Sequence, residues 1–179
     1  IVESRYWIIE KVLAQSVDQI TLIRNVLSEG GGAWVNTSRR MMGWYQNLKL
    51  YLNHAESLDV TIQGGAWGLA CNSIHFIDLV CWLTNEILIS VCTDRLSQEW
   101  ISAKRSGYFE VLGELRATFS NGSMLKLVST NCERRHEIKI KRHDGSEIII
   151  SENEGLFKFS SGFVLAGHFE LQSKMTGKL

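Results

Sequence analysis

One short stretch of the sequence carries side chains that could move a proton. It contains Cys71, His75 and Asp78, whose spacings of four and three residues place them on or near one face of a helix. An imidazole has an unperturbed pKa of about 6.5, so it can accept or release a proton near neutral pH. Alternatively, a single histidine on an apolar helix is a core residue satisfied by its neighbours. The spacing alone leaves both interpretations of His75 open.

The helix that carries this histidine is predicted within residues 64–83. The stretch opens with a glycine-rich turn and continues with apolar side chains at helical spacing. The stripe expected to pack against a sheet consists of Leu69, Ile74, Ile77, Val80, Cys81 and Trp82. Asn72 and Ser73 lie in the first turns, so polar groups project near the expected N-terminus of the helix.

A second chemically useful residue, Lys11, follows a predicted strand. Residues 6–9 are aromatic and β-branched, which indicates a short buried strand. Ser16 is a plausible N-cap for the amphipathic helix that follows, and residues 33–35 predict the next strand. A strand, helix and strand in this order favour parallel pairing, which places Lys11 at the carboxyl end of a strand, where ligands usually bind.

Two arginines, Arg39 and Arg40, stand at the start of the next predicted helix, which lies within residues 36–52. Its apolar positions are Met41, Trp44 or Tyr45, Leu48, and Tyr51 or Leu52. Arg39 and Arg40 are electrostatically unfavourable at a helix N-terminus unless an anion neutralises them, so an anionic ligand group is one interpretation. Solvated arginines or a surface ion pair are the other.

The second half of the chain predicts β structure. Strands at residues 58–63 and 87–91 flank the His75 helix and repeat the strand, helix, strand order. Asn-Gly within residues 120–122 and Asp-Gly within 143–145 separate alternating runs, which predicts two hairpins in an antiparallel meander with helices on one face. Residues 95–107 are too polar for a core and are expected to form a long loop.

Composition narrows the class of protein. Lys plus Arg and Asp plus Glu number 19 each, so no net field attracts nucleic acid or an anionic membrane. The apolar runs are far shorter than the ~20 residues of a membrane helix, and no signal sequence opens the chain. No CxxC spacing occurs among the four cysteines, which argues against a zinc site and a disulfide framework. We therefore expect a soluble cytoplasmic protein without a metal, a nucleic acid partner or a membrane partner.

One local basic cluster stands out against this balance. Its members alternate along a predicted strand: Arg134, Arg135, Lys139, Lys141 and Arg142. The alternation favours a solvated strand face, with a phosphate site as the alternative.

Several segments together resemble the glucose-fructose oxidoreductase and inositol dehydrogenase family (Gfo/Idh/MocA). They are IIEKVLAQS, WVNTSRRMMGWYQNLK, GGAWGLACNSIHFIDLVCWL and LRATFSNGSMLKL. Members are NAD(P)-dependent sugar oxidoreductases with a Rossmann domain followed by an α+β domain. The resemblance implies an α+β chain in which residues 1–35 are the end of a Rossmann-type β-α-β unit. Residues 36–179 would form a large open, mainly antiparallel sheet with helices on one face, truncated at its C-terminus.

The resemblance also assigns roles. Glu10 and Lys11 match the family's Glu-Lys-Pro motif, whose lysine lies near the nicotinamide and the reacting hydroxyl, and His75 matches its proton-transferring histidine. Val12 replaces the motif proline and Cys71 replaces an aspartate, which removes a carboxylate that Asn72 can replace only as a hydrogen-bonding group. The remaining implied substrate contacts are Asn36, Arg39, Arg40, Cys71 and Asn72.

The implied cofactor is NAD or NADP, bound by the full-length parent protein. No GxGxxG motif occurs, so this chain alone is not expected to bind it tightly. The implied substrate is a sugar or nucleotide sugar, and the open sheet would form a homodimer or homotetramer. The alternative is a non-enzymatic scaffold that uses the sheet for oligomerisation.

Overall fold

The computed structural model describes residues 5–11, 13–14, 16–28, 32–52, 57–103 and 105–166. The chain divides into two compact units, Ile1–Ser38 and Arg39–Leu179. This division lies three residues beyond the position expected from the sequence.

The first unit is a single β-α-β unit. It consists of β1 (Trp7–Ile9), α1 (Val17–Ser28) and β2 (Ala33–Val35). The two strands pair in parallel, with Ile8 opposite Trp34, as the sequence predicted. Ser16 acts as the N-cap of α1, because its Oγ accepts a hydrogen bond from the backbone N–H of Gln19 at 3.3 Å.

The expected burial of the first strand is wrong for this chain. Ile8 is 73% exposed, and Trp7 and Trp34 are also exposed. Two strands of three residues and one helix provide too little surface to cover both faces of a sheet. The apolar sequence therefore identifies the strand correctly, but its side chains are not shielded within this unit.

The second unit begins with a short helical segment and alternates helices with strands before becoming entirely β. Its elements are η1 (Ser38–Met41, which starts at the last residue of the first unit), α2 (Gly43–Tyr51), β3 (Leu58–Gly64), α3 (Leu69–Thr84), β4 (Leu88–Ser102), β5 (Phe109–Phe119), β6 (Met124–Ser129), β7 (Glu137–Arg142), β8 (Glu147–Ser151), η2 (Glu152–Glu154), β9 (Leu156–Phe159) and β10 (Val164–Ala166).

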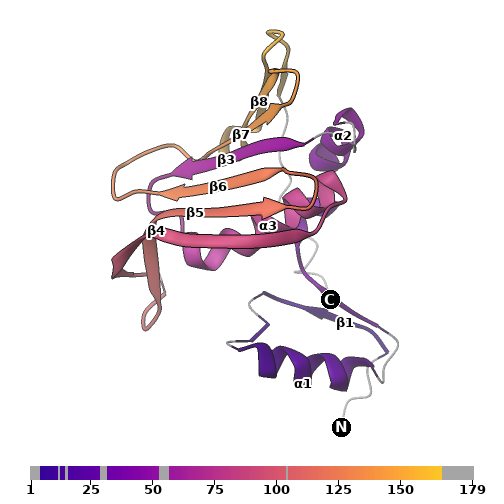
Figure 1. Cartoon of the computed structure of the whole chain (residues 1–179), viewed down its shortest axis with the longest axis vertical. Helices are drawn as coiled ribbons and strands as arrows, with labels where there is room; N and C mark the ends of the chain where they lie inside the picture. Colours follow the sequence, from indigo (N-terminus) through magenta and orange to yellow (C-terminus); the bar gives the residue numbers. More distant parts are fainter. Residues whose placement is uncertain are drawn as a thin grey trace. The chain divides into compact units, whose positions relative to one another are not determined.

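Eight of these strands form one sheet in the order β10-β9-β8-β7-β3-β6-β5-β4. Figure 1 shows the part of this order from β8 to β4. Every neighbouring pair is antiparallel except β3 and β6, which are parallel. The large, mainly antiparallel sheet predicted from the sequence is thus confirmed. Both predicted hairpins are present, with Gly122 and Gly145 in the left-handed conformation that their turns require.

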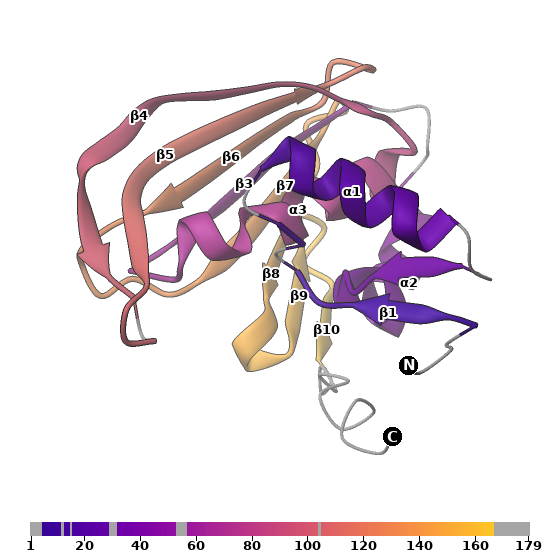
Figure 2. The same cartoon turned by 90° about the horizontal axis from the view of Figure 1, so that it is seen from below.

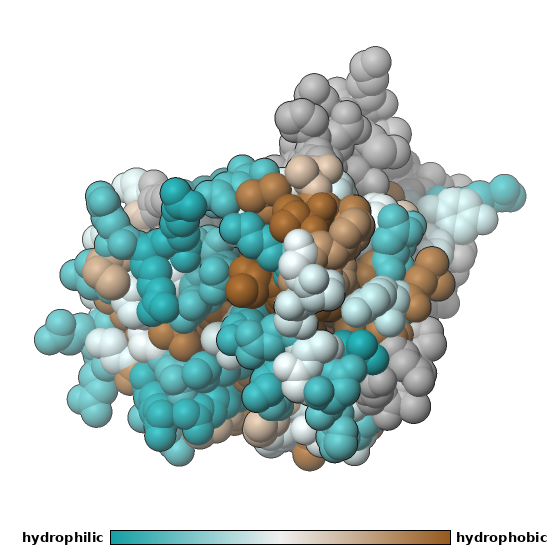
Figure 3. Space-filling view, turned by 90° about the horizontal axis from the view of Figure 1, so that it is seen from above, coloured by the Kyte–Doolittle hydropathy of each residue, from teal (hydrophilic) through white to brown (hydrophobic). Residues whose placement is uncertain are grey.

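One face of the sheet forms the core with the helices. Figure 2 shows α3 on the concave side of the curved sheet. Alternate strand residues point to this side and are buried, together with the inner residues of α2 and α3. On the surface, Figure 3 shows a group of hydrophobic side chains surrounded by hydrophilic ones on one face of the molecule.

The buried stripes of the helices differ from those expected. In α3 the fully buried apolar residues are Leu69, Phe76, Leu79, Val80 and Leu83, whereas Ile74 is 45% exposed. In α2 Tyr45 and Leu48 are buried, whereas Met41, which lies in η1 before α2, is exposed. When a helix has apolar residues on several sides, its packing against the sheet determines which of these sides is buried.

The predicted loop at residues 95–107 is also wrong, because β4 continues through Ser102. Among the described strands, β4 lies at one edge of the sheet and pairs with β5 alone, through several register shifts. An edge strand needs a backbone partner but no buried side chains, so its polar sequence does not prevent pairing.

Candidate active site

The face of α3 that carries the predicted chemistry lies outside its buried stripe. Cys71 is exposed, and His75 is half-buried with its Nδ1 atom shielded from solvent. Asp78 continues this face one turn later and accepts a hydrogen bond from Arg40 Nε at 2.6 Å. The predicted helix therefore does hold these three side chains along one side.

A carboxylate from a neighbouring strand caps this helix. Glu110 of β5 accepts hydrogen bonds from the backbone N–H groups of Ala70 and Cys71, at 2.8 and 3.1 Å. Negative charge is favourable at this end of a helix, where the amides have no helical partners. Nothing in the local sequence of α3 indicates this contact, because Glu110 lies far along the chain.

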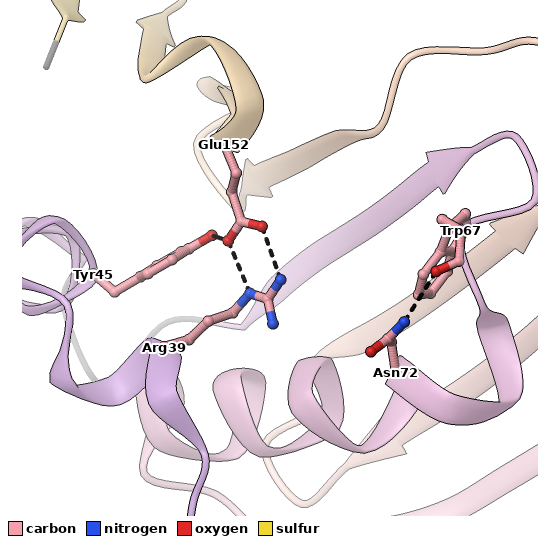
Figure 4. A network of polar contacts seen from close by, with 5 residues as sticks. All are labelled: Arg39, Tyr45, Trp67, Asn72 and Glu152. Atoms are coloured by element: carbon pink, nitrogen blue, oxygen red, sulfur yellow. Dashed lines mark hydrogen bonds and ion pairs between the residues drawn. The ribbon is translucent and has the colours of Figure 1, made fainter. Parts of the chain in front are cut away.

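Asn72 is tied to the turn that precedes α3. Its Nδ2 donates to the carbonyl oxygen of Trp67 at 2.9 Å (Figure 4). Trp67 in turn donates from Nε1 to the carbonyl of Val128 on β6 at 2.8 Å. The N-terminal turn of α3 is thereby fixed to the sheet.

A largely buried polar network joins η1, α2 and η2 (Figure 4). Arg39 donates from Nε and Nη2 to the two carboxylate oxygens of Glu152, both at 2.8 Å, and Tyr45 donates to Glu152 Oε1 at 2.5 Å. Burial alone would raise the pKa of Glu152, but hydrogen bonding and the charge of Arg39 outweigh it and lower the pKa. Burial, followed by the charge of Glu152, raises the pKa of Tyr45 well above its usual value.

His136 lies beside this network. Its ring is 5.4 Å from that of Trp67 and 5.7 Å from that of Phe76, and the Arg39 guanidinium lies 4.2 Å from the centre of the Phe76 ring. Burial lowers the pKa of His136; Glu152 opposes this shift and Arg39 reinforces it. The sequence interpretation did not single out His136.

A pocket opens beside Trp67 and His136, with a volume of about 690 Å³. It is formed where the turn after β3 meets the loop between β6 and β7 and a residue of η2. Its lining residues are Gly65, Ala66, Trp67, Asn131, Cys132, Glu133, Arg134, Arg135, His136 and Asn153. The pocket belongs entirely to the second unit.

The predicted residues of the first unit cluster at the carboxyl ends of its strands. Lys11 follows β1, and Asn36 directly follows β2. Asn36 donates from Nδ2 to Glu10 Oε1 at 2.6 Å and from its backbone N–H to the Ile9 carbonyl at 2.8 Å. The predicted role of Val12 concerns a residue outside the described ranges.

Internal carboxylates pair with both arginines that sequence analysis connected with an anionic ligand. Glu152 binds Arg39 and Asp78 binds Arg40. Arg40 thus forms the ion pair that the sequence left open as an alternative, and Arg39 forms a more deeply buried one.

Within the described ranges, no helix is both long and apolar enough to cross a membrane. Nor does this part of the chain bring together three or more His, Cys, Asp or Glu side chains that could hold a metal ion.

Comparison with known proteins gives structural matches alone. No family model matches the sequence, and no curated protein matches it. The UDP-N-acetylglucosamine 3-dehydrogenase GnnA from Acidithiobacillus ferrooxidans is similar over 96% of this chain and 58% of its own, at 14% identity and a TM-score of 0.65.

Two further solved structures show the same likeness. A dehydrogenase (MviM) from Clostridium difficile is similar over 89% of this chain and 55% of its own, at 15% identity and a TM-score of 0.60. A dehydrogenase from Chromobacterium violaceum is similar over 86% of this chain and 48% of its own, at 13% identity and a TM-score of 0.60. The chain therefore spans about half the length of these structures, and the likeness establishes a shared fold.

Proposed function

Because this chain has the fold of the C-terminal domain of Gfo/Idh/MocA oxidoreductases, we propose that it is the substrate-binding and catalytic portion of an NAD(P)-dependent dehydrogenase. Its substrate would be a sugar or a nucleotide sugar, the class named for the similar GnnA structure. The observation that carries the proposal is the position of His75 on α3, half-buried and outside the packed stripe of the helix, in a fold shared over nearly the whole chain.

The proposed chemistry is oxidation of a carbinol carbon or its reverse. The nicotinamide, when bound, accepts or supplies the hydride. His75 takes the proton from the substrate hydroxyl as the carbon is oxidised, and returns it in the opposite direction. From the family resemblance, Lys11 would supply the positive charge that stabilises the developing alkoxide.

The first unit suits contacts to the reactive end of such a cofactor. Glu10 and Lys11 follow β1 at the carboxyl edge of a parallel pair, the usual ligand edge of an open α/β sheet. The chain has no glycine-rich strand-to-helix turn of the GxGxxG type, so in this proposal the pyrophosphate is held by another part of the whole protein.

The test uses the full-length natural protein that contains this chain. NAD and NADP are each combined with UDP-N-acetylglucosamine and with free sugars, and reduction of the nucleotide is followed by absorbance. We expect His75→Ala to lower kcat about 10²- to 10⁴-fold, the usual contribution of a general base. His143→Ala, in the exposed turn between β7 and β8, is the matched control. An unchanged kcat in the His75 variant would remove this residue from the mechanism.

A second candidate function is assembly through the uncovered sheet face, as a homodimer or homotetramer. The strand registers place one transverse row of side chains on that face: Arg116, Lys126, Thr61, Lys139, Ile149 and Lys158. Within the described residues, no helix packs its buried side chains against this row, because the buried residues of α2 and α3 pack on the opposite face of the sheet. Cys71 in place of an aspartate also suits a chain that has lost its chemistry.

Sedimentation of the full-length protein tests this candidate. Lys126→Glu combined with Lys139→Glu is expected to dissociate an oligomer formed through the sheet face, whereas Lys49→Glu, on α2, is not. An oligomer that binds neither dinucleotide nor sugar in calorimetry would favour the scaffold function over the dehydrogenase.

A further inference from the structure

Three of the five basic residues in the cluster at residues 134–142 form ion pairs, whereas Arg134 and Lys141 have no carboxylate partner among the described residues. Arg135, Lys139 and Arg142 each form an ion pair, with Glu154, Glu147 and Asp144 respectively. Lys141 is exposed on β7.

Arg134 differs from these residues. Within the described ranges its side chain has neither a carboxylate nor a ring partner, although it lines the 690 Å³ pocket. The other arginines of the second unit each have such a partner. A guanidinium left available at a pocket can bind an anionic oxygen group through two parallel N–H donors.

The loop that carries Arg134 is fixed by its backbone. The carbonyl of Arg134 accepts a hydrogen bond from the Gly65 N–H at 3.0 Å, and Thr130 donates from its N–H to the Gly64 carbonyl at 3.2 Å. A Cβ on Gly65 would stand 2.8 Å from the carbonyl oxygen of Cys132, so the two segments approach as closely as glycine allows. The pocket wall is thus preformed, which reduces the ordering cost of binding.

The remaining lining groups suit hydroxyl recognition. Glu133 provides acceptors only, whereas the amides of Asn131 and Asn153 provide both donors and acceptors. Trp67 adds an aromatic surface, and the volume lies within the range of small-molecule sites. Hydroxyl groups together with one anionic group describe a phosphorylated sugar.

The pocket also adjoins the proposed chemistry. The turn 65–67 that forms one wall leads directly into α3, and Asn72, held to the Trp67 carbonyl, lies one helical turn before His75. We propose that this pocket binds the phosphate-bearing part of a sugar phosphate or nucleoside diphosphate sugar, with Arg134 holding the phosphate. This assignment rests on the proposed function for the identity of the ligand as substrate, but binding requires neither the cofactor nor His75.

Binding to the 179-residue chain is measured by calorimetry with N-acetylglucosamine 1-phosphate, UDP-N-acetylglucosamine, unmodified N-acetylglucosamine and inorganic phosphate. We expect the phosphorylated sugars to bind more tightly than either N-acetylglucosamine or phosphate alone. The ratio of the affinities for the two phosphorylated sugars distinguishes the two ligand classes. Tighter binding of UDP-N-acetylglucosamine identifies a nucleoside diphosphate sugar, and tighter binding of N-acetylglucosamine 1-phosphate identifies a sugar phosphate.

Arg134→Gln is expected to weaken binding of the phosphorylated sugars at least about tenfold, the effect of one charged hydrogen bond, and to leave N-acetylglucosamine binding unchanged. Arg134→Lys should retain part of the affinity, because it keeps the charge and loses the planar fork. Arg105→Gln, whose guanidinium lies over Tyr108 outside the pocket, is the matched control.

Equal affinities of the Arg134→Gln and Arg105→Gln variants would overturn the assignment, as would absence of binding by both phosphorylated sugars at millimolar concentration. Loss of turnover in His75→Ala with binding retained supports both proposals. Binding that depends on Arg134, in a full-length protein that reduces neither NAD nor NADP, supports the pocket and contradicts the dehydrogenase.

Discussion

Arg39 and Glu152 lie 113 positions apart in the sequence and form a two-pronged ion pair in which each side chain is only 17% exposed. The pair joins η1, where the second unit begins, to η2, which follows β8. Tyr45 shares the same carboxylate. The segment that leads into α2 is therefore held to the connection between β8 and β9 by an ion pair as well as by packing.

Removing this carboxylate's charge should destabilise the chain strongly. Glu152→Gln leaves Arg39 as an uncompensated, largely buried cation, so we expect the free energy of unfolding to fall by about 3 kcal/mol. Urea unfolding followed by circular dichroism measures it. Arg95→Gln breaks a 3.4 Å pair with Glu114 in which the arginine is 64% exposed, and Glu114 keeps its contact with Arg116, so this change should cost less than about 1 kcal/mol. Similar losses in the free energy of unfolding would show that the pair of Arg39 and Glu152 contributes no more to stability than the pair of Arg95 and Glu114.

The half-buried position of His136 predicts a pH dependence of stability. Because burial lowers its folded-state pKa below 6.5, the unfolded chain takes up a proton first as the pH falls through 6.5. Stability should therefore decrease from pH 7 downward until the folded-state pKa is passed, and then show no further loss from this group. His136→Gln should remove this slope, while His143→Gln, in an exposed turn, should retain it. Direct titration by NMR would contradict the prediction if the pKa of His136 were 6.5 or higher.

Gly113 should tolerate no side chain. It has φ of 111°, and a Cβ there would stand 2.4 Å from the Arg95 carbonyl oxygen and 2.9 Å from Leu96 Cα on β4. Gly113→Ala should cost roughly 3 kcal/mol or more, since a backbone clash adds to the strain of positive φ. Gly122→Ala shares the strain, at φ of 84°, but meets no atom within 4 Å, so it should cost only about 1 kcal/mol. Thermal unfolding of both variants provides the comparison.

Glu110 should stabilise α3 from outside the helix. Glu110→Ala removes the acceptor for the Ala70 and Cys71 N–H groups and should lower the free energy of unfolding by about 1 kcal/mol. Hydrogen exchange at these two amides should accelerate in the variant, whereas amides in the middle of α3 should change less. Unchanged exchange at Ala70 and Cys71 would show that the capping bonds do not persist in solution.

The parts of the fold that sequence predicts well are those fixed by local chemistry. Asn121-Gly122 and Asp144-Gly145 determine their hairpins because glycine alone enters those turn conformations freely. Ser16 identifies the start of α1 for a similarly local reason, its side-chain bond to the first helical turn.

Nonlocal features escaped the sequence interpretation for equally physical reasons. The polar second half of β4 has no hydrophobic period, because an edge strand paired on one side needs none. The pairing of Arg39 with Glu152 depends on where η2 comes to rest, which residue types alone do not determine. The predicted buried stripe of α3 wrongly included Ile74, because this helix is apolar on several sides.

In the candidate site, too, local features were predictable from the sequence and nonlocal features were not. The helix that carries His75 was predicted from its apolar residues at helical spacing, and the spacing of His75 to Cys71 and Asp78 placed the three on one face. The pocket could not be predicted in this way, because its walls come from segments around residues 65–67, 131–136 and 153, which meet only after the sheet has formed. Glu110 reaches the N-terminus of α3 from a strand of the second half, so no local signal reveals it.

The parallel pairing of β3 with β6 has a consequence for how the protein is made. β3 lies at the middle of the sheet, and both of its neighbours, β6 and β7, are encoded far downstream. A growing chain therefore exposes the apolar strand and α3 before either hydrogen-bonding partner has left the ribosome. The slowest step of folding should be the pairing of β3 with β6 and β7. Until this step, the exposed apolar surface of β3 and α3 is where a chaperone would bind.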